Sequence, residues 1–430
     1  MMHAPELLDS VRDEDALRVT SRLARSGYQA FLVGGCVRDL YVGRKPKDFD
    51  VATNAHPRQV RRLFPRNSHI IGRRFRLVHV RYGRDSIVET ATFRAEPNPN
   101  GDDDDLLITE DNEYGTAATD AQRRDFTVNG LFLDPASGEI HDYVGGLDDL
   151  ETGTLRTIGD PFTRLAEDPV RILRAVKFAT RLGFQIEDMT WEAMCGLTPE
   201  LSRAAPPRVF EEILRLLRSG TALGAFRKMR SCGALDVILP DVEEHLAEIG
   251  ESDAGEFWRL LEALDSEVHR GYQPSTAVCV ALLHYDRIVR QADPETRTLP
   301  GKAKDLNHVA GDLIAPLAEL ARLSRKDSGR ARRIIVQQRT FVRPASKNFR
   351  PRLFCLSEDF DDALELFRLR ASARGQGWDI YEGWVERKKQ AESLSDDELD
   401  AERKKGRRRS RPRRRRRSGG SGGSGGAKQG

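Results

Sequence analysis

The stretch FLVGGCVRDLYVGRKPKDFDV, residues 31 to 51, joins an apolar run, two adjacent glycines and two aspartates one residue apart. The apolar run before Gly34 and Gly35 predicts a short buried strand, and CVRDLYVG predicts a helix that begins at the glycine turn. PKDFDVAT then predicts a second strand. This order places a flexible turn close to paired acidic side chains.

The two aspartates, Asp48 and Asp50, are expected on one face of the second strand because side chains two residues apart point the same way. Carboxylates on one face repel each other unless a cation lies between them, and hard oxygen ligands suit Mg²⁺. Two such ions, about 3.5 to 4 Å apart, would clamp the attacking and leaving oxygens of an in-line phosphoryl displacement. The alternative is a solvated strand edge with two surface acids.

The glycine turn supplies the second half of a nucleotide site. Gly34 and Gly35, between a strand and a helix, let the backbone come close to a phosphate. Arg38, one helical turn later, is placed to make a bidentate contact with a triphosphate. A plain turn without a ligand is the alternative reading of the glycines.

The rest of the chain predicts an α+β protein. A mixed sheet with helices fits residues 28 to 150, and beyond Thr154 apolar residues recur at helical spacing. The chain then divides into regions: an N-terminal helix or extension (1–27), a catalytic head (28–153), a helical neck (154–218), a helical body with a C-terminal RNA-binding region (219–400), and a disordered Arg-rich and Gly/Ser tail (401–430).

Together, the glycine turn, Arg38 and the paired aspartates resemble the active-site opening of the DNA polymerase β-like nucleotidyltransferases. The resemblance is to the bacterial branch that contains poly(A) polymerases and CCA-adding tRNA nucleotidyltransferases, and it covers residues 28 to about 215. It implies that the glycines and Arg38 hold a nucleoside triphosphate while Asp48 and Asp50 hold two Mg²⁺ ions.

RRDFTVNG, residues 123 to 130, resembles the second motif of that family. The resemblance implies contacts to the sugar and phosphates of the nucleotide, for which Arg123, Arg124 and Asn129 are suited. Asp125 is a candidate third catalytic carboxylate, and Glu89 in IVETATFR is the other candidate. Asp125 is preferred because it lies inside the motif.

EDPVRILRAVKFATRLGF, residues 167 to 184, resembles the neck motif of the family. On a helix, Asp168, Arg171 and Arg174 would share a face. The resemblance implies that Asp168 and Arg171 present a base-pairing edge to the incoming nucleotide, so that protein replaces a template. A surface ladder of ion pairs is the alternative.

HDYVGGLDDL, residues 141 to 150, resembles the hinge between the catalytic head and the neck. Its glycines, Gly145 and Gly146, would allow the head to swing. A plain interdomain turn is an equal alternative.

Two features favour poly(A) addition over CCA addition. IIGRRFRLVHV, residues 70 to 80, resembles a stretch typical of bacterial poly(A) polymerases, and residues 403 to 430 hold 13 of the 70 basic residues, leaving 57 basic against 67 acidic residues before them. Such a tail would hold single-stranded RNA 3′ ends with low sequence specificity. CCA addition is the alternative, and an inactive RNA-binding relative is a remote one. The Gly/Ser end is either native or an appended linker.

Composition limits the remaining classes. The chain has 430 residues, of which 32% are charged, and no apolar run reaches the roughly 18 residues of a spanning helix. The five cysteines are scattered singly and predict neither a disulfide framework nor a zinc site. We therefore expect a cytoplasmic adenylyltransferase that uses ATP and RNA, with RNA-decay proteins as candidate partners and no membrane.

Overall fold

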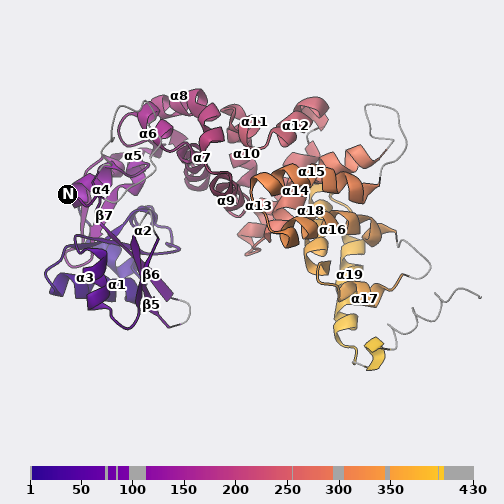
Figure 1. Ribbon diagram of the computed structural model, residues 1–430, viewed down its shortest axis with the longest axis horizontal. Helices are drawn as coiled ribbons and strands as arrows, with labels where there is room; N and C mark the ends of the chain where they lie inside the picture. The colour runs from indigo at the N-terminus through magenta and orange to yellow at the C-terminus, as the bar shows by residue number, and fades with distance from the viewer. Residues whose placement is uncertain are drawn as a thin grey trace, which may run out of the picture.

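The computed structural model describes residues 2–72, 76–83, 86–95, 113–253, 255–293, 305–343, 349–395 and 397–400. The protein forms an arc with a mixed α/β head at one end and helices along the rest (Figure 1). The predicted α+β class, a head with a sheet followed by helical regions, is confirmed. In the described part of the chain, no helix is long and apolar enough to cross a membrane.

An eight-stranded sheet forms the centre of the head, in the order β1-β8-β7-β2-β3-β6-β5-β4. The only parallel neighbours among these described strands are β3 and β6, and the others are antiparallel. The strands are β1 (Met2–His3), β2 (Ala30–Val33), β3 (Asp50–Thr53), β4 (Ser68–Ile71), β5 (Leu77–Tyr82), β6 (Ser86–Thr92), β7 (Leu131–Asp134) and β8 (Glu139–Asp142).

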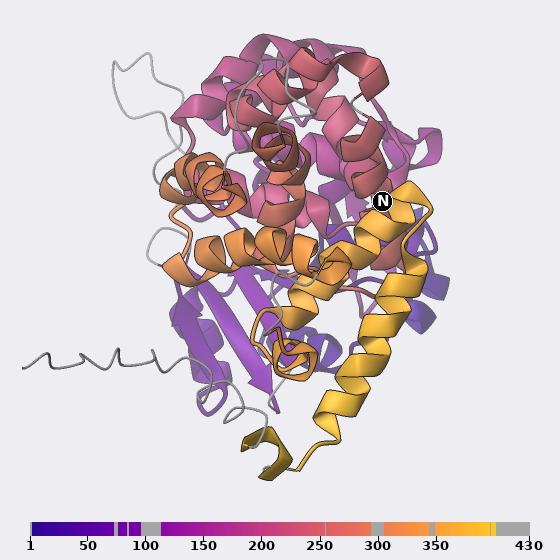
Figure 2. The ribbon, with the colours of Figure 1, turned by 90° about the vertical axis from the view of Figure 1, so that its right-hand side faces the viewer.

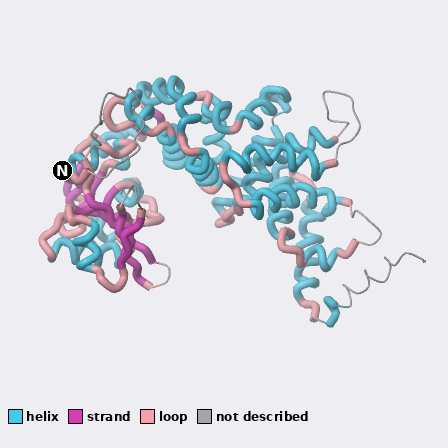
Figure 3. The backbone as a smooth tube through the Cα atoms, in the orientation of Figure 1, coloured by secondary structure: helices cyan, strands magenta, loops and turns pink. Residues whose placement is uncertain are grey.

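Two apolar layers fix this sheet. On one face, valines of β5 and β6 join the main core, together with side chains of α1 (Glu14–Arg25) and α3 (Pro57–Leu63). On the other face, a small cluster around Phe31, Phe93 and Phe132 lies under α4 (Ala117–Gln122). Figure 3 shows α1 and α3 on the side of the strands that faces away from the helical body.

Helices make up the neck and body. Figure 2, viewed from the side of the body, shows the strands of the head behind the body helices and below the neck. The neck and its junction contain α5 (Gly146–Thr152), β9 (Thr154–Leu155), α6 (Pro161–Glu167), α7 (Val170–Leu182), β10 (Gln185–Ile186), α8 (Asp188–Leu197) and α9 (Pro206–Leu217). The later helices are α10 (Ala222–Ser231), α11 (Ala234–Ile238), α12 (Pro240–Asp253), α13 (Gly255–His269), α14 (Thr276–Ala292), α15 (Leu306–Leu320), α16 (Arg325–Val342), α17 (Pro351–Cys355), α18 (Phe360–Arg374) and α19 (Trp378–Glu392).

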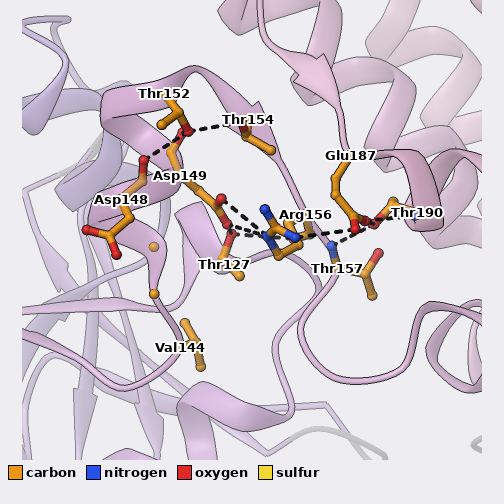
Figure 4. A network of polar contacts seen from close by, with 12 residues as sticks. Thr127, Val144, Asp148, Asp149, Thr152, Thr154, Arg156, Thr157, Glu187 and Thr190 are labelled. Carbon is orange, nitrogen blue, oxygen red and sulfur yellow. Dashed lines mark hydrogen bonds and ion pairs between the residues drawn. The ribbon is translucent and has the colours of Figure 1, made fainter.

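Polar contacts join the head to the neck (Figure 4). Thr127, just before β7, donates its hydroxyl to the buried carboxylate of Asp149 on α5 at 2.6 Å. Arg156 lies between that carboxylate, with its Nε at 3.2 Å, and Glu187 before α8, with its Nη1 at 3.3 Å. The RRDFTVNG motif is thereby tied to the first neck helices.

The proposed hinge is a braced turn in this structure. The carboxylate of Asp142 accepts the backbone N–H groups of Val144, Gly145, Gly146 and Leu147 at 2.9 to 3.1 Å. Gly145 has a φ of 80°, and a Cβ on Gly146 would lie 2.3 Å from the carbonyl oxygen of Thr127. Both glycines are therefore explained by the turn and its packing, and swinging of the head stays a prediction.

Several predicted elements differ in detail. β3 begins at Asp50, so Asp48 lies before the predicted strand. Two short parallel strands, β9 and β10, occur in the neck, where only helices were expected. Arg73 to Phe75 of the RRF stretch, and the tail from residue 401, lie outside the described residues.

Candidate active site

One cavity of about 660 Å³ lies between the head and the neck. Its head side includes the glycine turn and both predicted aspartates, and its neck side includes charged residues of α7 and α9. Of the predicted site residues, the cavity is lined by Gly34, Gly35, Arg38, Asp48, Asp50, Arg124, Asp125, Asn129, Asp168, Arg171 and Arg174. Arg123 and the alternative third acid, Glu89, do not line it.

Asp48 and Asp50 are both exposed at this cavity. Val51 is paired with Thr90 in the parallel register of β3 and β6, so Asp50 lies beside Glu89. Desolvation by the surrounding protein, then Glu89 and Asp48, raise the pKa of Asp50 to about 6, while Arg124 opposes the shift. Neighbouring acids thus destabilise the charge on Asp50 when no cation is bound.

This donor set fits a hard divalent cation that keeps part of its shell for other ligands. Among the described residues, no three His, Cys, Asp or Glu side chains are grouped to hold a metal. The mutual repulsion of the carboxylates would be relieved by Mg²⁺, whose remaining ligands are typically water and substrate phosphates. The site therefore needs a phosphate-bearing substrate to be completed.

The glycine turn matches its predicted role more closely than Arg38 does. Gly34 has a φ of 73° and a ψ of −126°, a conformation that a side chain would strain, and a Cβ there would lie 2.9 Å from Nη1 of Arg124. Arg38 is only 2% exposed. Its guanidinium donates to Asp39 at 2.8 and 2.6 Å and to the side-chain oxygen of Asn129 at 2.5 Å.

Arg38 is thus a brace between two motifs and not the free phosphate clamp that the sequence predicts. Burial lowers the pKa of Arg38, and the neighbouring Asp39 opposes this change. Asp39 also accepts Nη2 of Arg181 on α7 at 3.1 Å, which extends the brace to the neck.

The two predicted phosphate arginines share an acid. Arg123 donates to Oδ1 of Asp120 at 3.0 and 2.9 Å, and Arg124 donates to Oδ2 at 3.2 and 3.0 Å. Burial opposes ionisation of Asp120, but the two arginines outweigh it and hold the pKa of this carboxyl below its usual value. Of the two, Arg124 reaches the cavity, beside Gly34, and remains the better candidate for a phosphate contact.

Asp125, the preferred third carboxylate, is already paired with other side chains. Its Oδ2 accepts Nη2 of Arg174 at 2.6 Å and its Oδ1 accepts the side-chain amide of Asn129 at 3.0 Å. Burial opposes ionisation, yet Arg174 and Asn129 outweigh it and hold the pKa of Asp125 far below its usual value. Asp125 therefore behaves as a structural ion pair, and the geometry favours Glu89 as the neighbour of the aspartate pair.

The neck motif also departs from prediction. Asp168 follows the last residue of α6 and has non-helical backbone angles, so it does not share a helical face with Arg171 and Arg174. Its two carboxylate oxygens accept Nη1 and Nη2 of Arg208 on α9 at 2.9 and 2.6 Å. Arg171 instead donates to the carbonyl of Arg164 at 2.7 Å and lies 3.2 Å from Glu167.

Sequence reasoning missed the residues that complete the cavity wall. Arg208 is 40 positions from Asp168, and no local sequence pattern predicts that the two side chains pair. Lys47, next to Asp48, lines the cavity and was passed over although a cation beside paired acids is a readable signal. Long-range pairs of this kind appear only once α7 and α9 are packed together.

Comparison with known proteins adds two family matches. Residues 30–156 match the poly A polymerase head domain, and residues 183–246 match a probable RNA and SrmB-binding site of polymerase A. The head and the start of the helical body are therefore similar to the corresponding parts of poly(A) polymerases.

Individual relatives agree. Poly(A) polymerase I of Haemophilus influenzae is 43% identical over 246 residues, covering 56% of this chain and 54% of the relative. Poly(A) polymerase I of Escherichia coli O6:H1 is 41% identical over 287 residues, covering 65% and 61%. The CCA-adding enzyme of Bacillus velezensis is 35% identical over 236 residues, covering 54% and 58%. The chain thus spans between half and two thirds of these relatives.

A solved structure supports the fold. The CCA-adding enzyme of Bacillus stearothermophilus in complex with CTP has a TM-score of 0.64 and 24% identity, and the match covers 87% of this chain and 81% of that one. At this identity, the likeness shows that head, neck and body share one architecture and does not decide which nucleotide is added.

Proposed function

We propose that this protein transfers the adenylyl group of ATP to the 3′ ends of RNA without a template. The observation that carries the proposal is one cavity that is lined by Asp48 and Asp50, by the glycine turn, and by Asp168 and Arg171. A phosphate-handling head and a base-facing neck are the two parts that such a reaction needs.

In the reaction, the RNA 3′-oxygen forms a bond to the α-phosphorus of ATP while the bond to the β-phosphate oxygen breaks and pyrophosphate leaves. The hydroxyl proton passes to solvent. Asp48 and Asp50 would hold Mg²⁺, with two ions as the expected number. When bound, the metal lowers the pKa of the hydroxyl and neutralises the departing pyrophosphate.

The residues around the aspartates bind and orient. Gly34 and Gly35 let the backbone approach the triphosphate, and Arg124 and Lys47 add positive charge at the cavity. Arg38 holds the turn through Asp39 and Asn129. Glu89, beside Asp50, is the third acid in place of Asp125.

On the neck side, Asp168 and Arg171 would read the base. Arg208 restricts the orientation of the Asp168 carboxylate because it occupies one lone pair of each oxygen. Arg171 is held by Glu167 and the carbonyl of Arg164, which limits its movement. A reading pair fixed in this way suits one nucleotide better than an alternating sequence of nucleotides.

The choice of poly(A) over CCA rests on the relatives. Those named poly(A) polymerase I are 41 to 45% identical, against 35 to 37% for those named CCA-adding or CC-adding enzymes. CCA addition is the second candidate, because those relatives share the same head. RNA ends in general, ATP, and proteins of RNA decay are the proposed partners, in the cytoplasm.

Extension assays would test the function. The purified chain is incubated with Mg²⁺ and either a generic RNA oligomer or tRNA lacking its 3′ end, with each nucleotide alone and in mixture. We expect a long ladder of A on either RNA. Three residues added only to tRNA would establish CCA addition, and no addition on either RNA would refute the proposal.

A further inference from the structure

Among the described residues, one face of β4, β5 and β6 has no helix packed against it with several contacts. In the described part of the head, the helices with several contacts to β4, β5 and β6 are α1 and α3. They cover the face of Val78, Val80 and Val88, which belong to the main core. Side chains of the alternate positions therefore point to the opposite face.

That opposite face leads directly to the catalytic aspartates. His69 is paired with His79, and His79 is paired with Glu89, across β4, β5 and β6. The parallel register of β3 and β6 continues this row to Asp50. Nε2 of His79 lies 3.3 Å from Oε1 of Glu89, so these two side chains of the row are in contact across β5 and β6.

The composition of this face is mixed. Ile71 and Ile87 are 41% and 43% exposed, which is unusual for large apolar side chains on a sheet. Arg81, at an alternate position of β5, is exposed on the same face. Imidazole rings, branched aliphatic side chains and one arginine offer stacking surface for bases and a contact for phosphate.

The position of this open face of β4, β5 and β6 indicates which substrate would bind there. Figures 1 and 3 show that β5 and β6 lie on the side of the head toward the body, across the concave side of the arc. The neck side of the cavity holds the base-reading residues, so the acceptor strand must reach Asp50 from another direction. The row of Glu89, His79 and His69 provides that direction.

We propose that the open face of β4, β5 and β6 seats the last nucleotides of the RNA acceptor strand. His79 and Ile87 contact the terminal bases, and Arg81 contacts a phosphate further from the 3′ end. The contacts read no base edge, which suits an acceptor of any sequence. This inference rests on the proposed function, and it assigns the acceptor path that the function requires.

Steady-state kinetics of the full chain test the surface. Arg81→Gln, Ile87→Ser and His79→Ala are compared with the wild type on a 12-nucleotide oligo(A) primer. We expect the primer KM to rise about tenfold for the apolar and imidazole changes, because a stacked base is lost, and less for Arg81→Gln. The KM for ATP should stay within twofold.

A matched control lies on the other side of the same sheet. Arg61 on α3 is exposed, and Arg61→Gln removes the same charge as Arg81→Gln from the helix-covered side. We expect no change in primer KM for this control. Equal primer KM in the three open-face variants and the wild type, or an equal rise in Arg61→Gln, would overturn the proposal.

A second measurement separates this proposal from the proposed function. A primer with 4-thiouridine at its penultimate position is cross-linked to the full chain without ATP, which requires no adenylyl transfer. Cross-linked peptides from residues 76 to 92 are expected, and cross-links confined to α3 or the body would contradict the acceptor path. A chain that cross-links as expected but adds no nucleotide would refute the function alone.

Discussion

The carboxylates on the two sides of the active-site cavity lie in opposite electrostatic environments. On the head side, Asp48 and Asp50 are exposed carboxylates, and desolvation together with the neighbouring Glu89 and Asp48 raises the pKa of Asp50. Toward the neck, Asp125 of the head is held by Arg174 of α7, and Asp168 is held by Arg208 of α9, at 2.6 Å in both cases. Residues of the same type thus lie within one cavity in two different electrostatic states.

This difference distinguishes the carboxylates that are available to bind a cation from those that stabilise the fold. A carboxylate already paired with arginine gains little from a cation, because its charge is compensated and its lone pairs are occupied. A carboxylate destabilised by like charges gains the most. Asp48 and Asp50, which have no arginine partner in the described part of the chain, are therefore prepared for metal and phosphate. The Asp125–Arg174 pair instead joins the head to the neck, and the Asp168–Arg208 pair joins the end of α6 to α9 within the neck.

The largest effect is expected from Asp50→Asn. Removing one of the two ligand carboxylates should lower the rate of adenylyl transfer by roughly 10³-fold or more, since a metal site contributes several kcal/mol to transition-state stabilisation. ATP affinity, measured by equilibrium binding, should change far less. Asp148→Asn, an exposed acid on α5, is the control and should leave turnover unchanged. Turnover near the wild-type value in Asp50→Asn would remove the head-side carboxylates from the chemistry.

The second prediction compares substitutions at the two candidates for the third catalytic acid, Asp125 and Glu89. Asp125→Asn leaves Arg174 without its charge partner and should destabilise folding by about 2–3 kcal/mol, somewhat less than for a fully buried pair because Arg174 is partly exposed. Glu89→Gln should leave the unfolding free energy nearly unchanged and lower turnover about 10- to 100-fold. Urea unfolding and single-turnover kinetics measure both variants. A stable but inactive Asp125→Asn would restore Asp125 as the catalytic acid.

A third prediction concerns base choice. Arg208→Gln removes the bidentate partner of Asp168, so this carboxylate should adopt more orientations. We expect the preference for ATP over CTP, as a ratio of kcat/KM values, to fall about tenfold, which corresponds to roughly 1.4 kcal/mol. Arg203→Gln, on the segment before α9, is the control. An unchanged ratio would mean that Arg208 only stabilises the neck.

The sequence was sufficient for what local patterns encode. The glycine turn, the paired aspartates and the order of head and helical regions follow from short apolar runs, glycines and resemblance. It failed where the role of a side chain depends on a partner far along the chain. Arg38 looked like a phosphate ligand until Asn129, 91 positions later, was seen to accept its hydrogen bond.

The choice between Asp125 and Glu89 shows the same limit. Membership of a motif favoured Asp125, whereas the parallel pairing of β3 and β6 brings Glu89 beside Asp50. The register between two strands that are not consecutive in the chain cannot be predicted from the sequence of either strand alone. Asp168 was misplaced for a related reason, because the proline at position 169 separates it from the helix that follows.

The smallest effect is expected from pH, and it acts on the head side alone. The pKa of Asp50 is about 6 in the folded protein against 3.8 for a free side chain, so this carboxyl is increasingly protonated below pH 6. A protonated carboxyl holds a cation poorly, and Mg²⁺-dependent turnover should fall several-fold between pH 7 and pH 5.5.

The free energy of unfolding should change with pH in the opposite direction to turnover. The folded state binds the proton of Asp50 more tightly than the unfolded state, so the ionised carboxylate lowers stability above pH 6. Asp50→Asn should therefore stabilise the metal-free protein by about 1 kcal/mol at pH 7.5, after allowance for solvent screening, and by little at pH 4. Urea unfolding at the two pH values measures this difference. An equal effect at both values would show that the surroundings do not raise the pKa of Asp50.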